Sequence, residues 1–168
     1  MNFLLTEANF DDGLHLTLRT CVLDLQISDE TFAANADKEG RRGAEIIWVL
    51  DEDKCRFDNR WRKRDTQLIA NMIAASQKNR ALMDKVHPER MIEIKFDADC
   101  LYFYSSYITE SYLDCLTESE PPNIPLVVNK FPKSKPLSLS NNQDRKILFL
   151  YLAALRKYAL SLTPYYMS

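Results

Sequence analysis

The sequence predicts a single α/β domain over residues 1–168, with a mixed central sheet flanked by helices. Two apolar segments, residues 22–28 and 44–50, are typical of buried strands, and the polar stretch between them suits a helix. Near the C-terminus, residues 142–158 carry apolar side chains at helical spacing. With 46% hydrophobic and 27% charged residues, a chain of this length can build one hydrophobic core.

Strands are expected at the N-terminal end of the chain. Residues 3–10 are predicted to form a strand that ends at the turn signal Asp11-Asp12-Gly13. Apolar and polar residues alternate from Leu14 to Arg19, and the alternation changes phase near Thr20-Cys21. This change predicts a β-bulge before the first buried strand.

The segment between the two buried strands is expected to be a helix. Ser28 or Asp29 is a suitable N-cap, and the helix is predicted to end near Gly40 or Gly43. The strand that follows, residues 44–50, is almost entirely apolar. Burial on both faces is therefore expected, as in a parallel or mixed sheet.

The second half of the chain is expected to contain both helices and strands. A charged stretch from residue 51 to 64 precedes a predicted helix over residues 66–86. Residues 91–96 and 101–107 are predicted to form a hairpin, and residues 109–117 a short helix.

The C-terminal end combines a proline-rich loop with a helix. Five of the seven prolines fall in residues 121–136, which predicts a rigid extended loop around a short strand at 126–128. Asn141 or Asn142 is expected to cap the final helix, and Pro164 to end it.

One strand carries polar side chains that suit a metal site. Asp24 and Gln26 lie two residues apart in the strand over residues 22–28, so their side chains point to the same face. A strand that presents two such groups together is typical of a nuclease active site.

The pattern around this strand resembles the competence-type branch of the PD-(D/E)xK nuclease superfamily, whose last motif is Glu/Asp-x-Gln. The resemblance covers residues 7–51, about a third of the chain. It rests on Glu7-Ala8-Asn9-Phe10 as the first strand, Asp24-Leu25-Gln26-Ile27-Ser28 as the second, Phe32 as the aromatic residue of the helix, and Gly43 before the strand Ile47-Trp48-Val49-Leu50.

The resemblance implies a restriction-endonuclease-like core over about residues 1–64. A C-terminal hairpin, proline-rich loop and helix would be added to it over about residues 65–168. It also implies Mg²⁺ as the cofactor and hydrolysis of DNA phosphodiester bonds as the reaction. In this assignment Asp24 is a catalytic metal ligand, with Asp12 or Asn9 as the second ligand.

Two further residues take part in the implied site. Gln26 would position the water or the scissile phosphate in place of the usual lysine, and Glu7 would be an outer carboxylate. The sequence departs from the family pattern at Asn9, where a carboxylate is usual, because an amide is a weaker ligand for a hard cation. Asp24 also replaces the usual Glu, and Asp12, which could supply the missing carboxylate, equally suits a turn.

A second tripeptide matches the commoner Glu-x-Lys pattern. Glu93-Ile94-Lys95 lies in an alternating strand, and its lysine could orient the attacking water or stabilise transition-state charge. Its upstream acid would be Asp84 or Glu89, and neither lies on a convincing preceding strand. A solvated strand face is therefore the expected role of this tripeptide.

A basic stretch is the best nucleic-acid feature of the sequence. Five cations and two aromatic residues lie within residues 56–64, where the cations could bind phosphates and Trp61 could stack on a base. The expected nucleic-acid-binding residues are Arg56, Arg60, Trp61, Arg62 and Arg64. Nearby acids could instead pair with these arginines, and the net charge of −2 gives no general attraction to DNA.

Composition excludes several other classes of protein. No apolar run is long enough for a membrane span, and no signal peptide is recognisable, so a cytoplasmic location without membrane contact is expected. The four cysteines are widely spaced and only two histidines are present, which argues against a zinc site. Three glycines without a phosphate-binding loop argue against P-loop and Rossmann folds.

Two functions remain open from the sequence. The first is a Mg²⁺-dependent DNA nuclease or nuclease-like subunit. The second is a catalytically inactive protein of the same fold that binds a protein partner, as a phage or bacterial defence, counter-defence or immunity factor.

Overall fold

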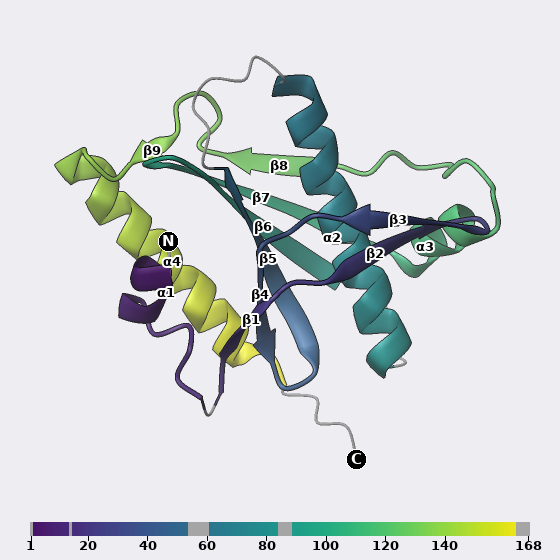
Figure 1. The fold of residues 1–168 in the computed structure, drawn as a ribbon, viewed down its shortest axis with the longest axis horizontal. Helices are drawn as coiled ribbons and strands as arrows, with labels where there is room; N and C mark the ends of the chain where they lie inside the picture. The colour runs from purple at the N-terminus through teal and green to yellow at the C-terminus, as the bar shows by residue number, and fades with distance from the viewer. Residues whose placement is uncertain (1, 14, 54–60, 84–88, 164–168) are drawn as a thin grey trace.

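The computed structural model describes residues 2–13, 15–53, 61–83 and 89–163 (Figure 1). The helices in these ranges are α1 (Asn2–Glu7), α2 (Trp61–Met83), α3 (Glu110–Thr117) and α4 (Asn142–Ser161). The strands are β1 (Thr17–Thr20), β2 (Leu23–Ile27), β3 (Glu30–Ala34), β4 (Lys38–Arg42), β5 (Glu45–Asp53), β6 (Glu89–Asp97), β7 (Cys100–Ile108), β8 (Val128–Phe131) and β9 (Leu137–Ser138).

Seven of these strands form one mixed sheet. Their order is β1-β4-β5-β6-β7-β8, and β9 also pairs with β7. Strands β5 and β6 are parallel and are joined through α2, whereas the other neighbouring pairs are antiparallel. The predicted mixed α/β architecture is therefore confirmed.

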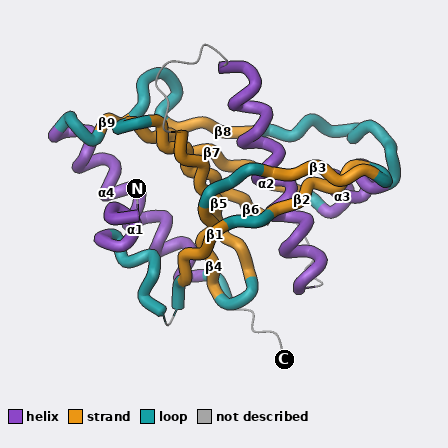
Figure 2. The backbone as a smooth tube through the Cα atoms, in the orientation of Figure 1, coloured by secondary structure: helices purple, strands orange, loops and turns teal. Residues whose placement is uncertain are grey.

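Helices cover both faces of the sheet. One face is covered by α1 and α4, and the other by α2 with the two-stranded sheet β2–β3 and α3 (Figure 1). The β2–β3 hairpin stands apart from the main sheet and lies along α2 (Figure 2). Each face has its own hydrophobic core, because neighbouring residues of β5 point to opposite sides: Val49 packs beneath α2 and Leu50 beneath α4.

Trp48 is the largest side chain in the core beneath α4. Its ring packs edge-on against Phe10 at 5.5 Å and lies directly over Gly40 of the neighbouring strand. A Cβ atom at Gly40 would come within 2.0 Å of the indole. Glycine is therefore required there to let the ring approach the backbone.

Most elements after residue 43 match the sequence prediction. The apolar strand over residues 44–50 is confirmed within β5, and its residues Ile46–Leu50 are buried. Helices α2, α3 and α4 and the β6–β7 hairpin are also confirmed. Asn141 caps α4 by accepting hydrogen bonds from Gln143 and Asp144. The strand expected at residues 126–128 is displaced to β8, after the proline-rich loop.

The prediction of a strand over residues 3–10 is wrong. The segment forms α1, which ends where Asn9 adopts a left-handed conformation with φ of 60°. Leu5 and Phe10 are buried in the core beneath α4. The buried apolar residues therefore lie in a short helix and in the turn that follows it. The segment is too short for its sequence pattern to distinguish a helix from a strand.

The prediction of a helix from residue 28 to about residue 40 is also wrong. Ser28 and Asp29 form a two-residue turn, with Ser28 at φ of 55°, and β3 pairs back onto β2. A contact with another element stabilises the turn, because the Ser28 amide donates a hydrogen bond to the carbonyl of Leu116 at the end of α3. Good capping residues are also good turn residues, and here the tertiary contact selects the turn.

The β-bulge expected near Thr20-Cys21 is likewise wrong. The chain leaves the main sheet there, since β1 belongs to the seven-stranded sheet and β2 to the hairpin. A register shift occurs instead between Gly40 and Arg41 of β4. Among the described residues, no helix has the length and hydrophobicity to cross a membrane.

Candidate functional site

Asp24 and Gln26 lie on the outer hairpin, not on the main sheet. Asp24 is exposed opposite Ala33. The Gln26 side chain donates to the Ser28 carbonyl at 2.8 Å and accepts from Thr31 at 2.8 Å, so it stabilises the hairpin turn. The Gln26 amide donates a hydrogen bond to the side-chain oxygen of Gln77 in α2 at 2.9 Å, and the Gln77 side-chain nitrogen donates to the Gln26 carbonyl at 2.8 Å.

Asp12 and Asn9 lie on the α4 side of the sheet. One Asp12 oxygen accepts from the amides of His15 and Leu16 at 2.7 and 3.0 Å, which closes the loop after α1. Arg156 of α4 contacts the other Asp12 oxygen at 3.3 Å and donates to the Asn9 carbonyl at 3.0 Å. The structure thus brings Asp12 and Asn9 together around a cation, but on the face opposite Asp24.

The predicted nucleic-acid residues fall mostly beyond what the structure describes. Arg56 and Arg60 lie outside the described residues. Trp61, Arg62 and Arg64 belong to the first turns of α2, where only the backbone is described.

A different polar cluster lies at the carboxyl end of the parallel strands β5 and β6. We call it the carboxyl-edge site and define it as Asp37, Asp51, Glu93 and Lys95. Strand pairing places Asp51 beside Lys95, and Val49 beside Glu93. Because side chains alternate along a strand, Asp51, Glu93 and Lys95 share the face beneath α2.

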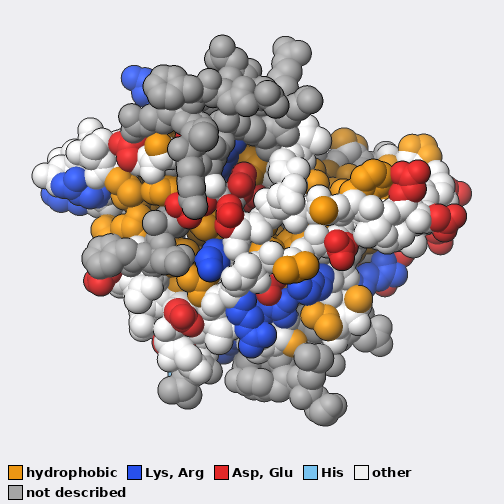
Figure 3. All heavy atoms as spheres, in the orientation of Figure 1, with side chains coloured by type: hydrophobic (Ala, Val, Ile, Leu, Met, Phe, Trp, Pro, Cys, Tyr) orange, Lys and Arg blue, Asp and Glu red, His pale blue; other side chains and the backbone are white. Residues whose placement is uncertain are grey.

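Asp37 joins this cluster from the residue before β4. Its amide donates to the Leu50 carbonyl at 2.8 Å, and its carboxylate accepts from the Glu52 amide at 2.7 Å. These two bonds join Asp37 to the backbone of β5 on either side of Asp51. Figure 3 shows acidic side chains gathered near this end of β5.

Glu93 is the buried member of the site, with no exposed surface. Asn71 of α2 donates to one of its oxygens at 3.0 Å, and Gln67 donates to Asn71 at 3.1 Å. The other Glu93 oxygen is buried without a hydrogen-bond partner among the described residues. Lys95 is 4% exposed, so the expectation of a solvated strand face for Glu93-Ile94-Lys95 is wrong.

Burial dominates the electrostatics of Glu93. Loss of hydration raises its pKa well above the ordinary value, and the negative charge of Asp51 acts in the same direction. The Asn71 hydrogen bond and the charge of Lys95 lower the pKa, but by less. A buried acid whose pKa is raised in this way is typical of functional sites.

Helix α2 supplies the polar partners of this face. Its Asn71 contacts Glu93 and its Asn79 contacts Glu89, so the helix runs antiparallel to β6. Its N-terminal end therefore lies toward the carboxyl edge of β5 and β6. Asn79 also makes two bonds with the backbone of Ile46, at 2.8 and 2.7 Å.

A second buried charge cluster lies further along the same face. Arg41 donates to Glu39 at 2.6 Å, and Lys78 of α2 lies 3.7 Å from the same carboxylate. The Cys21 thiol donates to Glu39 at 3.6 Å, and burial with the nearby carboxylate raises its pKa to about 12. The charges of Arg41 and Lys78 are paired with the Glu39 carboxylate, so we assign a structural role to this cluster.

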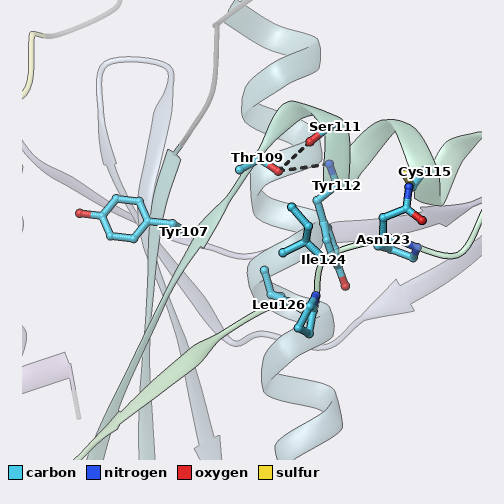
Figure 4. Close-up of a pocket in the computed structure, with 10 residues that line it drawn as sticks. Tyr107, Thr109, Ser111, Tyr112, Cys115, Asn123, Ile124 and Leu126 are labelled. Carbon is cyan, nitrogen blue, oxygen red and sulfur yellow. Dashed lines mark hydrogen bonds between the residues drawn. The ribbon is translucent and has the colours of Figure 1, made fainter.

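An apolar pocket of about 280 Å³ lies between α3 and the proline-rich loop. Figure 4 shows Tyr112, Ile124 and Leu126 lying close together in it, whereas Tyr107 points away. Thr109 accepts from the Tyr112 amide at 3.2 Å and thereby caps α3. No charged residue is among the described residues that line the pocket.

Asp37 and Asp51 were not predicted from the sequence as site residues. Their positions could have indicated them, because Asp37 directly precedes β4 and Asp51 lies near the carboxyl end of β5. Ligands commonly bind beyond such strand ends. A further Glu-x-Lys tripeptide, Glu52-Asp53-Lys54, follows in the sequence, although Lys54 lies outside the described residues.

Among the described residues, no group of three or more histidine, cysteine or acidic side chains could hold a metal ion. Mg²⁺ commonly uses one or two protein carboxylates and completes its coordination shell with water. In comparisons with known proteins, no family model, curated protein or solved structure matched the chain.

Proposed function

We propose that the protein is a Mg²⁺-dependent nuclease that acts at the carboxyl-edge site. The observation that carries the proposal is the juxtaposition of Asp51, Glu93 and Lys95 on one face of two parallel strands. Carboxylates that can hold a metal ion, together with a lysine that can stabilise charge on the phosphate, are groups that metal-dependent phosphodiester hydrolysis can use.

Each residue has a distinct task in the proposed reaction. Asp37 and Asp51 would hold Mg²⁺, which supplies an activated water and neutralises phosphate charge. Lys95 stabilises the negative charge that develops on the phosphate. Glu93 would hold a proton beside Lys95, and the added positive charge of a bound metal ion would favour its release to water.

The architecture is compatible with this assignment. The support is at the level of fold class, a mixed sheet with helices on both faces, because the strand at residues 7–10 and the helix after Ser28 that carried the nuclease resemblance do not form. The proposal moves the site from Asp24 to Asp51, because Asp24 has no acidic partner on its own hairpin face and Asp12 lies across the sheet.

Cleavage of plasmid and single-stranded DNA with Mg²⁺ or Mn²⁺ tests the proposal. Wild-type protein should cut, Asp51→Asn should lose at least about a hundredfold in rate, and Asp24→Asn should cut like wild type. Loss of cutting in Asp24→Asn with retention in Asp51→Asn would return the site to the hairpin. Absence of cutting by folded wild type with every metal would refute the nuclease function.

A protein-binding role is the second candidate, and one surface favours it. Helix α4 exposes Phe149 and Leu150, with 43% and 70% of their surface accessible. A contiguous exposed apolar patch commonly marks a protein contact, and these two residues are neighbours on the helix. Under this alternative, DNA remains intact and Leu150→Glu abolishes co-purification of a specific partner, which Asp51→Asn retains.

A further inference from the structure

A second cavity lies on the opposite face of the sheet from the carboxyl-edge site. It has a volume of about 320 Å³ and is enclosed by α4 and strands β6, β7 and β8. This volume is at the lower end of the range for small-molecule sites. The cavity combines aromatic rings, the two cationic residues Arg90 and Lys130, and the neutral polar residues Ser105 and Asn129, all of which are described.

The aromatic part is a ladder of three rings. Tyr151 of α4 stacks on Phe131 of β8 at 4.2 Å with an interplanar angle of 17°. It also stacks on Phe103 of β7 at 5.7 Å and 28°. Tyr151 lines the cavity and remains 38% exposed although it stacks on both phenylalanines.

Two cationic residues line the cavity, Lys130 of β8 and Arg90 of β6. The Lys130 ammonium lies over the rings of Tyr102 and Tyr104, at 4.1 and 5.4 Å from their centres, so Arg90 is the candidate for contacting a ligand. Its guanidinium lies 5.0 Å from the ring centre of Tyr107 and 6.0 Å from that of Tyr158. Stacking of this kind orients the guanidinium plane and leaves its N–H groups able to bind an anion. Arg90 makes no ion pair with a described carboxylate, which distinguishes it from Arg41, Arg80 and Arg156.

The acids nearest to this cation do not occupy the cavity. Glu89 points to the other face of the sheet, where Ser76 donates to it at 2.9 Å. Glu45 is 3% exposed and does not line the cavity. The lining therefore carries the positive charges of Arg90 and Lys130 and no acidic residue, with Ser105 and Asn129 as neutral hydrogen-bonding groups on neighbouring strands.

We propose that this cavity binds a nucleotide unit, with the base stacked on Tyr151 and the phosphate held by Arg90. Asn129, which is exposed and makes no side-chain hydrogen bond with another described residue, can pair with the edge of the base. Stacking on aromatic rings combined with an arginine for the phosphate is a common way to bind single nucleotides and single strands. The proposal does not depend on hydrolysis, because the two sites lie on opposite faces.

Isothermal titration calorimetry in the presence of EDTA tests whether the cavity binds a nucleotide unit. The probes are deoxyadenosine monophosphate, a short single-stranded oligodeoxyadenylate and deoxyadenosine, which lacks the phosphate. Wild-type protein should bind at least one phosphate-bearing probe saturably, and bind deoxyadenosine more weakly. Arg90→Gln should weaken that binding about tenfold or more, because a charged hydrogen bond is lost.

Two further variants make the result decisive. Asn129→Ala, at an exposed position, should weaken binding without changing the fold, whereas Arg80→Gln should bind like wild type because Arg80 pairs with Asp114 on the other face. Binding of the monophosphate indicates a free nucleotide as ligand, and binding of the oligonucleotide alone indicates a unit within a strand. No saturable binding up to millimolar probe, or equal affinity for wild type and Arg90→Gln, would overturn the proposal.

Discussion

Asn71 of α2 donates a 3.0 Å hydrogen bond to one oxygen of Glu93, while the other oxygen of this carboxyl group is buried without a partner among the described residues. A fully ionised carboxylate is costly in such surroundings. The group can avoid this cost by retaining a proton, which is the physical basis of its raised pKa.

The stability of the protein should therefore depend on Glu93 in a pH-dependent way. Because its pKa is raised on folding, the folded state binds more protons than the unfolded state between the ordinary pKa and the raised one. The contribution of Glu93 is complete below the ordinary pKa and is lost as the pH rises through this window.

Glu93→Gln should remove this pH dependence and be more stable than wild type at neutral pH. The free energy of unfolding in urea, measured from acidic to mildly alkaline pH, checks the expectation. Asp24→Asn is the matched control, because Asp24 is exposed and the wild-type slope should persist. Identical slopes for wild type and Glu93→Gln would contradict the argument.

Asn71→Ala should destabilise the fold by about 1–3 kcal/mol, since it leaves buried polar groups without their partner. The loss should be larger at neutral than at acidic pH, because the Asn71 hydrogen bond favours the ionised form of Glu93. Chemical unfolding measures it. Gln67→Ala, at a half-buried position that donates only to Asn71, should cost less than Asn71→Ala, and the reverse order would count against the buried network.

Gly40→Ala should destabilise the protein by about 1–3 kcal/mol or more, because the new methyl group would overlap the indole of Trp48. The buried Trp48 should also report the change through a shifted fluorescence maximum. Gly13→Ala provides a contrast: no atom lies within 4 Å of its added Cβ, but its φ of 69° is strained for alanine. Its cost should be about 1 kcal/mol without any change in fluorescence.

Gln77→Ala should release the β2–β3 hairpin from α2, because its side chain makes two hydrogen bonds with the Gln26 backbone. We expect faster hydrogen exchange of the Gln26 amide and a loss of about 1–2 kcal/mol in global stability. Exchange at Ile94, in the middle of the sheet, should not change beyond this global loss. Unchanged exchange at Gln26 would show that apolar packing alone holds the hairpin.

The sequence by itself determined the mixed α/β class, the buried strand β5, the β6–β7 hairpin and helices α2 to α4. These elements are long or have strong periodicity, so local hydrophobic pattern and capping residues were sufficient to predict them. Residues 28–40 were different, since Ser28 and Asp29 suit both a helix cap and a turn, and only contacts with Leu116 and Gln77 select the turn.

The candidate site depended on tertiary structure for the same reason. Asp24 and Gln26 share a strand face in the sequence pattern, but the chain places that strand on an outer hairpin, away from Asp12. Asp37, Asp51 and Glu93 are distant in sequence, and the pairing of β4, β5 and β6 brings them together. A strand pattern reports which face a side chain occupies, whereas strand order decides which side chains become its neighbours.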